Sequence, residues 1–135
     1  KEINVRPYKL LALILAGLQF GVAVLYPTHL YTSVTFILIS SLLTFTARYK
    51  APILPVFFIS FSMILLPFFI SNGILTGTGI NEPVVRYNNN HNLNIRLLTI
   101  PLEDVFYGML LLLMNTLGFS YMAGRKSRHI IATES

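Results

Sequence analysis

The stretch that decides the fold is an apolar run with two adjacent acids near its start. It reads Ile100-Pro-Leu-Glu-Asp-Val-Phe-Tyr-Gly-Met-Leu-Leu-Leu-Leu-Met114. A carboxylate at the centre of a membrane helix costs about 2.5–3.5 kcal/mol to insert, and less near the interface. Glu103 and Asp104 lie one turn inside the run, so this part of the helix is expected to face protein or a polar cavity. An ionisable pair at that depth is a candidate functional site.

The composition extends this interpretation to the whole chain of 135 residues. Hydrophobic residues make up 54% and charged residues only 11%, whereas soluble domains carry about 25% charged residues. The chain has no cysteine, which excludes disulfides, zinc–thiolate sites and iron–sulfur clusters. The net charge of +5 does not indicate a nucleic-acid partner, because the basic residues cluster at the ends of apolar runs. The length fits one domain, and the first residue, Lys1, suggests a piece of a longer protein or a processed chain.

Four apolar runs predict four membrane-spanning helices and hence an all-α, multi-pass membrane protein. Each run approaches or exceeds the roughly 20 residues that cross about 30 Å of hydrocarbon. A backbone in lipid must also satisfy its own hydrogen bonds, which favours helices. The runs are Tyr8 to Tyr26, Leu30 to Ala47, Pro52 to Leu75 and Ile100 to Met122. A polar loop, 76–99, follows the third run and is expected to pack over the helix ends.

The basic residues predict the topology of these spans. Lysines and arginines gather before the first span, between the second and third, and after the fourth. The turn Pro27–His29 has none, and loop 76–99 has only Arg86 and Arg96. Because cytoplasmic loops carry the excess of Lys and Arg, both termini and the turn Arg48–Lys50 are expected on the cytoplasmic side of the inner membrane.

The fourth span also carries a stripe of small and polar residues. Spacing of three and four residues puts on one face Asp104, Gly108, Leu111, Asn115 and Gly118. Small residues permit close helix approach, and lipid offers an acid no compensation, so this stripe is expected to contact protein. Glu103 and Tyr107, four residues apart on the neighbouring stripe, are placed to form a hydrogen bond with each other.

The residues alone leave two interpretations of the acid pair open. Acids in a first turn interact favourably with the helix dipole, and Pro101 fits a helix start, so Glu103 and Asp104 could serve only as caps. Otherwise they carry chemistry or bind a ligand. Asn72 is equally open, because an Asn before a glycine is an ordinary helix end. His91 fits a loop residue better than a metal ligand, since no second His or Cys stands at ligand spacing.

Several motifs in the second half of the chain have a specific order. They are Ser71-Asn-Gly-Ile-Leu-Thr-Gly77, Glu82-Pro-Val-Val-Arg-Tyr-Asn88, Asn92, Arg96 and Thr99-Ile-Pro-Leu-Glu-Asp-Val-Phe-Tyr-Gly108. Together they resemble the second repeat of the membrane lycopene cyclase domain, the small type without a flavin motif, found as paired bacterial subunits and as fused archaeal and fungal proteins. That family has two related three-span repeats, each ending in a helix that opens with Pro-x-Glu-Glu/Asp. On this resemblance Leu30–Met122 is one repeat, and the first span links it to the other.

The resemblance implies a carotenoid cyclase that closes β-rings on lycopene with no net redox change, no cofactor and no metal. An acid protonates the terminal double bond, the next double bond attacks the tertiary cation, and a base removes a proton. Glu103 is the expected acid, and Asp104 its proton partner or the final base. The aromatic faces of Phe106 and Tyr107 are expected to shelter the cations by cation–π attraction.

The resemblance also implies where the substrate and the partner bind. The expected substrate-binding residues are Asn72, Tyr87, Asn88, Arg96, Phe106 and Tyr107. Only one Pro-x-Glu-Asp motif is present, at Pro101–Asp104. A partner subunit or another part of a longer cyclase is therefore expected to supply the missing first repeat. The expected partners are thus a carotenoid, the lipid bilayer and that repeat.

Three alternatives remain open. The chain could belong to a cyclase that makes ε-rings or acts on longer carotenes, because the proton that is lost decides the ring. It could be a non-catalytic subunit that binds carotenoid or supports assembly, for which the missing motif argues. A transporter that uses the acids as proton relays is disfavoured, since no pair of broken helices stands in corresponding halves.

Overall fold

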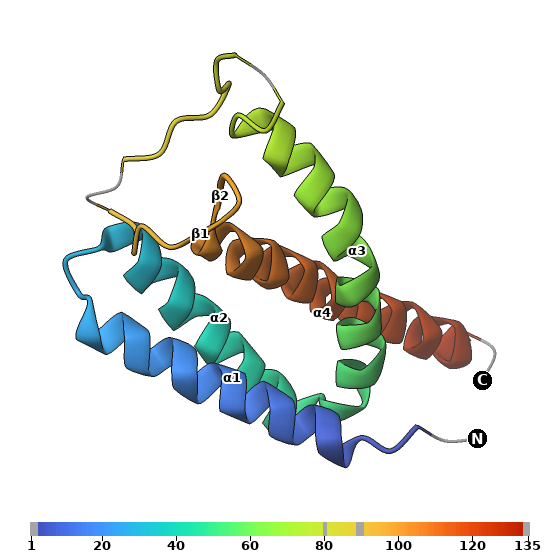
Figure 1. The fold of residues 1–135 in the computed structure, drawn as a ribbon. Coiled ribbons are helices and arrows are strands. Elements are labelled where there is room, and N and C mark those ends of the chain that lie inside the picture. The colour runs from blue at the N-terminus through green and yellow to red at the C-terminus, as the bar shows by residue number, and fades with distance from the viewer. Residues whose placement is uncertain (1–2, 80, 89–90, 134–135) are drawn as a thin grey trace.

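The computed structural model describes residues 3–79, 81–88 and 91–133, with side chains as far as residue 124. Its elements are α1 (Arg6–Leu25), α2 (Leu30–Tyr49), the 3-10 helix η1 (Ala51–Ile53), α3 (Leu54–Leu75), β1 (Arg96–Leu97), β2 (Ile100–Pro101) and α4 (Leu102–Thr133). Figure 1 shows their arrangement. Within the described residues, four helical segments are long and apolar enough to cross a membrane, with mean hydropathies of 1.4 to 2.5. The predicted all-α membrane fold is confirmed.

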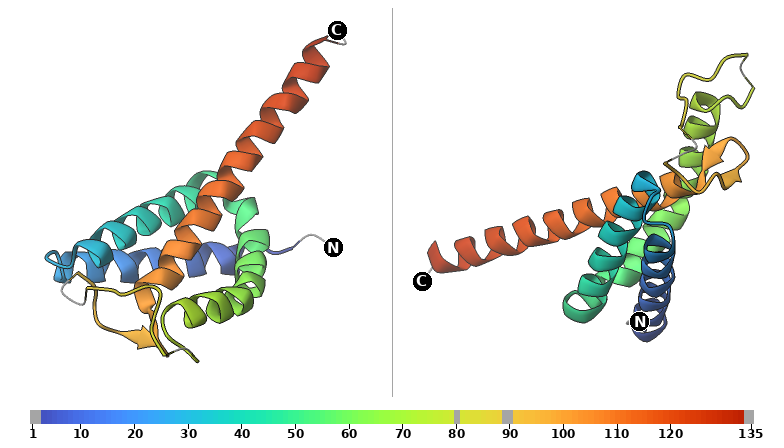
Figure 2. Two further views of the ribbon diagram at one scale, coloured as in Figure 1. Left: turned by 90° about the horizontal axis from the view of Figure 1, so that it is seen from above. Right: turned by 90° about the vertical axis from the view of Figure 1, so that its left-hand side faces the viewer.

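The first two helices form a closely packed pair, and they lie side by side in both Figure 1 and Figure 2. The residues that α1 buries are Ala12, Ala16, Gln19 and Ala23. Their spacing of three and four residues defines one helix face, and small side chains on that face let two helices approach closely. The other faces of α1 carry exposed leucines such as Leu10 and Leu18, as a lipid-facing helix would.

The apolar core joins α3 to α2 and α4 in the half of the molecule that holds the start of α3. Phe57 and Phe61 of α3 are buried there with Leu43 of α2 and Leu113 of α4. Pro67 lies inside α3, and proline in a helix interior removes one backbone hydrogen bond. The helix bends along its length, and its second half diverges from α4 (Figure 1).

The polar loop packs over the helix ends, as predicted. Backbone hydrogen bonds join it to three helices: Tyr31 N donates to His91 O at 3.0 Å, Val85 N to Leu75 O at 2.9 Å, and Leu102 N to Ile95 O at 2.9 Å. Each bond ties a loop residue to the first or last turn of a helix. The loop is therefore built into the end of the bundle where α4 begins.

A short hairpin precedes α4, and the sequence did not predict it. Leu97 pairs with Ile100 in an antiparallel register, so α4 begins at Leu102 rather than at Ile100. In the turn, the hydroxyl of Thr99 lies 2.7 Å from that of Thr76 and 2.8 Å from that of Thr78. These contacts hold the start of α4 against the end of α3.

The last helix extends beyond the apolar segment that predicted it. The sequence places the end of the span at Met122, where the apolar run stops, but α4 continues to Thr133. The added residues include Lys, Arg and Ala, which form helices readily in water. Figure 2 shows this end of α4 projecting well past the other helices.

Candidate functional site

Glu103 is fully enclosed at the start of α4, with 0% of its surface exposed. Its Oε1 atom accepts two hydrogen bonds, from Thr32 Oγ1 at 2.6 Å and from the backbone N–H of Leu93 at 2.6 Å. Its other oxygen, Oε2, is buried and has no hydrogen-bond partner among the described residues. The two oxygens of this carboxyl group are therefore in different surroundings.

Asp104 is bonded in a different way, although it is the next residue. Tyr31 donates to Oδ1 at 2.7 Å, and the hydroxyl of Tyr87 donates to Oδ2. Asp104 is 7% exposed. Burial raises the pKa of the Tyr87 phenol, and the hydrogen bond to Asp104 raises it further. Tyr87 therefore stays protonated and remains a hydrogen-bond donor to the aspartate.

These contacts bear on two expectations from the sequence. The carboxyl groups bond to side chains of α2 and to the loop rather than to the first N–H groups of α4, so capping alone does not account for the pair. The expected hydrogen bond between Glu103 and Tyr107 is wrong: Oε1 of Glu103 accepts from Thr32 and Leu93, and Oε2 has no partner among the described residues. The Tyr107 ring lies beside that of Tyr31 instead, at 6.4 Å between centroids.

A cleft of about 410 Å³ opens beside Asp104, between the second half of α3 and the first half of α4. We call it the acid cleft. Its lining residues are Tyr31, Phe68, Asn72, Tyr87, Asp104, Tyr107, Gly108 and Leu111. The cleft brings together four of the expected catalytic and substrate-binding residues, Asn72, Tyr87, Asp104 and Tyr107. It places aromatic rings and polar groups around one carboxyl group.

A glycine of α4 lies beside the Phe68 ring in the acid cleft. A Cβ atom built on Gly108 would lie 3.3 Å from Cε2 of Phe68, which is tighter than an ordinary van der Waals contact. The position of the Phe68 ring therefore depends on the missing side chain at residue 108. Lower on the same stripe, Asn115 and Gly118 are exposed and Leu111 is 42% exposed. The predicted protein contact thus holds for Asp104 and Gly108 within this chain, but not for the lower half of the stripe.

Phe106 lies on the other side of α4, in a second hollow. This apolar pocket of about 230 Å³ is lined by Leu18, Gln19, Val22, Phe36, Leu93, Ile95, Leu102 and Phe106. The ring of Phe106 meets that of Phe36 edge to face, at 5.2 Å between centroids. Successive residues of a helix point about 100° apart. The structure therefore does not bring Phe106 and Tyr107 into one aromatic wall.

Two further residues expected to bind substrate lie outside both hollows. Asn88 and Arg96 are exposed on the loop and the hairpin. Arg96 Nη1 donates to Thr99 O at 3.0 Å, across the hairpin turn. The hydrogen bond stabilises the turn that precedes α4, so in this chain Arg96 has a structural contact and does not line the acid cleft.

Sequence reasoning missed Tyr31 and Thr32, which hold the two acids. They open α2, more than 70 positions before Glu103 and Asp104. The only local signal is that polar residues begin an otherwise apolar run. No spacing rule connects that signal with the distant acid pair.

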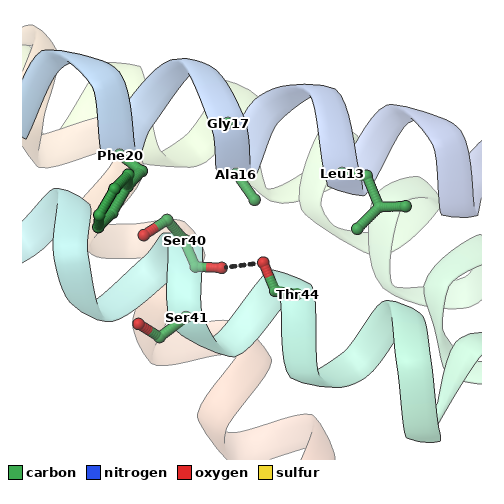
Figure 3. A pocket seen from close by; sticks show the side chains of 7 residues that line it. All are labelled: Leu13, Ala16, Gly17, Phe20, Ser40, Ser41 and Thr44. Atoms are coloured by element: carbon green, nitrogen blue, oxygen red, sulfur yellow. Dashed lines mark hydrogen bonds between the residues drawn. The ribbon is translucent and has the colours of Figure 1, made fainter.

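A third hollow, of about 420 Å³, lies between α1 and α2 and is shown in Figure 3. Its hydroxyl groups belong to Ser40, Ser41 and Thr44, and each donates to a carbonyl of its own helix. No acid or base lines it. Among the described residues, no three His, Cys, Asp or Glu side chains cluster as metal ligands would. The acid cleft is therefore the candidate functional site.

Comparison with known proteins gives a family match that covers most of the chain. A family model described as Lycopene cyclase matches residues 28–122. The match runs from the turn before α2 through the apolar part of α4 and includes every residue that lines the acid cleft. Searches of curated proteins and of solved structures give no match.

Proposed function

Because the chain belongs to the lycopene cyclase family, we propose that it closes the end rings of a linear carotenoid, converting lycopene into β-carotene. One observation carries the proposal beyond the family's general role in carotenoid cyclisation. Two adjacent carboxyl groups differ in their hydrogen bonds: Glu103 keeps one oxygen without a partner among the described residues, whereas Asp104 accepts at both oxygens. The reaction needs one acid and one base, and this asymmetry suits that division.

The chemistry is a proton-initiated cyclisation with no net redox change. A proton adds to the terminal double bond and leaves a tertiary cation. The electron pair of the next double bond forms the ring bond to that cation, and the positive charge moves to a ring carbon. A base then takes a neighbouring proton, and the electrons of that C–H bond become the new double bond. One proton enters and one leaves, so the acid and the base only need to exchange a proton between turnovers.

Glu103 is proposed as the acid. Thr32 and Leu93 both bond to Oε1, which fixes the carboxyl group and leaves Oε2 as the oxygen to carry a transferable proton. Asp104 is proposed as the base. It lines the acid cleft, and two phenol groups donate hydrogen bonds to its two oxygens. In the proposed cycle, Asp104 then returns the captured proton to Glu103.

Access to the cleft distinguishes the two acids. Asp104 lines the acid cleft, and Glu103 does not. The acid role of Glu103 therefore rests on its hydrogen bonding and on the resemblance in sequence. The reverse assignment, with Asp104 as the acid, gives a different outcome in the paired variants described in the Discussion.

The cleft also suits a carbocation. The rings of Tyr31, Phe68 and Tyr107 line it next to Asp104. Aromatic faces attract a cation within about 6 Å of the ring centre, and they carry no lone pair as reactive as that of water. Phe106 lies beside Phe36 in the apolar pocket. It can contact the substrate as proposed only if an end group of the carotenoid also enters that pocket.

We further propose that a second three-span repeat completes the site. The lower part of the small-residue stripe is exposed. Among the described residues, no atom beyond the local backbone of α4 lies within 4 Å of a Cβ built on Gly118. A stripe of small and polar residues that contacts no other described helix suits packing against a further helix. The second repeat would come from a partner chain or from a further part of the same protein.

Pigment analysis tests the function directly. The complete cyclase, meaning the natural gene for these residues together with any separately encoded repeat, is expressed in a lycopene-accumulating bacterium. Chromatography is expected to show β-carotene and its one-ring intermediate. The matched control carries Glu103→Gln and Asp104→Asn at equal membrane abundance. Lycopene that co-purifies unchanged with the unsubstituted protein would instead identify a binding subunit, and ε-rings would correct the ring type.

A further inference from the structure

We propose that Tyr31 and Tyr87 are positioning residues that hold Asp104 over one particular proton and thereby decide which ring is formed. The inference rests on the proposed function. It adds a role for two tyrosines that do not exchange a proton with the substrate themselves. Both residues line the acid cleft together with Asp104.

The geometry fixes Asp104 from two directions. Tyr31 comes from the first turn of α2 and donates to Oδ1 at 2.7 Å. Tyr87 comes from the loop and donates to Oδ2. A single bond would leave the carboxyl group free to rotate about its last side-chain torsion. Two bonds to different oxygens from separate elements set both its position and its plane.

The tyrosines are themselves held in place. The backbone N–H of Tyr31 donates to His91 O at 3.0 Å, which ties the start of α2 to the loop. Its ring packs against that of Tyr107 at 6.4 Å and 54°. Tyr87 is half-buried in the same loop, which joins α3 through the bond from Val85 N to Leu75 O. The two donors therefore belong to one tied assembly of α2, the loop and α4.

The final step of the reaction is sensitive to this placement. After ring closure the cationic ring carbon has three kinds of neighbouring C–H bond. Loss of a proton from the ring carbon that bears the polyene chain gives a β-ring. Loss from the ring methylene gives an ε-ring, and loss from the attached methyl group gives a γ-ring. In each case the C–H electron pair forms the double bond and the proton passes to Asp104.

These three protons compete for one base. They sit on carbons bonded to the same cationic centre, so a small movement of the carboxylate changes which proton is closest. A misplacement of about 1 Å costs on the order of 100-fold in a reaction that depends on orientation. A fixed base therefore gives one ring type, and a loosened base gives a mixture.

The test uses Tyr31→Phe, Tyr87→Phe and the double variant in the complete cyclase. Each keeps the ring and loses the hydroxyl group. Total conversion is expected to fall about tenfold for each lost hydrogen bond to the carboxylate. The share of ε- and γ-ends among cyclised products is expected to rise several-fold, and most in the double variant. Tyr49→Phe is the control, because Tyr49 is 70% exposed at the far end of α2.

The ring ratio separates positioning from a merely structural role. Lower conversion with an unchanged ring ratio would overturn the positioning role and leave the cyclase function standing. If the tyrosine variants changed neither the ring ratio nor the total conversion, the positioning role would be overturned as well. Absence of any cyclic product from the unsubstituted enzyme would instead remove the proposed function. Should the phenylalanine variants fail to accumulate, Asp104→Glu moves the base by one methylene with both tyrosines present, and an unshifted ring ratio would then contradict the proposal.

Discussion

Thr32 Oγ1 donates a hydrogen bond of 2.6 Å to Glu103 Oε1 across 71 positions of sequence. The bond joins the first turn of α2 to the first turn of α4, and both residues have 0% of their surface exposed. Burying a polar group costs free energy unless it is hydrogen-bonded, so this bond offsets part of the cost of enclosing Glu103. The acid of one span is thus held by a hydroxyl group of another.

The hydroxyl group of Thr32 is expected to contribute more to the free energy of unfolding than the shape of the side chain does. Thr32→Val keeps the volume but leaves Oε1 of Glu103 with only the N–H of Leu93 as a donor, and one lost hydrogen bond is expected to lower the free energy of unfolding by about 0.5–1.5 kcal/mol. Thr32→Ser keeps the donor and serves as the matched control. Unfolding of the purified protein in detergent, followed by far-UV circular dichroism, compares the free energies of unfolding. Equal stability of the two variants would show that this hydrogen bond contributes nothing.

Gly108 offers a test of the acid cleft itself. Gly108→Ala places a methyl group 3.3 Å from Phe68, and Gly108→Val adds more bulk at the same point. Overpacking of this kind costs about 1–3 kcal/mol, so conversion is expected to fall in the order Gly, Ala, Val while the protein still inserts. Gly124→Ala is the control, because no described atom beyond the local backbone of α4 lies within 4 Å of a Cβ built there. Full conversion by Gly108→Val would contradict a substrate site between Phe68 and Gly108.

The general fold could be predicted from the sequence because the signals for membrane helices are local. Each of the four runs is long enough to span the membrane, and its backbone must form its own hydrogen bonds there. A helix can therefore be predicted for each run without reference to the rest of the chain. The hairpin of Leu97 and Ile100 escaped prediction, since two-residue strands carry almost no pattern. The extension of α4 to Thr133 escaped it too, because a helix does not end where its apolar face ends.

The site could be predicted only in part, for a similar reason. Glu103 and Asp104 stand out because acids are costly inside an apolar run. Their partners Tyr31 and Thr32 are ordinary residues for the start of a span, and only the folded arrangement of α2 against α4 reveals them. Phe106 and Tyr107 are both expected from the sequence to shelter the cations. Successive residues of a helix point about 100° apart, and the two rings line different hollows.

The membrane orientation gives a further prediction. The turn before α2 and the loop lie at one end of the bundle, and η1 lies at the other with the N-terminal end of the chain (Figure 1). The chain has no cysteine of its own, so single cysteines at Thr28, Tyr49 and Val84 can be labelled without background. All three positions are exposed. Tyr49 is expected to react from the cytoplasmic side, and Thr28 and Val84 from the opposite side.

Labelling from both sides of intact and opened vesicles reads out this topology. Reaction of Thr28 and Tyr49 from the same side would contradict the crossing of α2. A complete reversal, with Tyr49 outside and the other two positions inside, would keep the helices and overturn the assignment of the termini to the cytoplasm.

The outward part of the small-residue stripe predicts an assembly defect without a folding defect. Within the part of the chain that the structure describes, no atom beyond the local backbone of α4 lies within 4 Å of a Cβ built on Gly118, so Gly118→Leu is not expected to destabilise the chain itself. A leucine on a helix-contact face would keep a partner helix from close approach. The amount of the second repeat recovered in a detergent pull-down with this chain is therefore expected to fall. Gly124→Leu, on a different face of α4, is the control, and equal recovery with both variants would count against the stripe as a contact surface.

The sharpest prediction concerns the acid pair. Glu103→Gln is expected to abolish ring formation while leaving the protein inserted, because an amide keeps the shape and accepts the bonds from Thr32 and Leu93 but cannot protonate an alkene. General acid–base groups contribute about 10²–10⁴-fold to a rate, and an alkene is a far weaker base than the oxygen or nitrogen of most substrates. Asp104→Asn is expected to slow turnover and, if Asp104 is the final base, to alter the ring ratio.

Chromatography of carotenes at matched membrane abundance decides between the assignments. If the acids only favoured the helix start, Glu103→Gln would cost a fraction of a kcal/mol and conversion would be near normal, since Gln remains a good helix former. If Asp104 were the acid, Asp104→Asn would give no cyclic product and Glu103→Gln would retain some. Loss of all product in Glu103→Gln, with residual and mixed rings in Asp104→Asn, is the outcome that the unequal hydrogen bonding of the two carboxyl groups predicts.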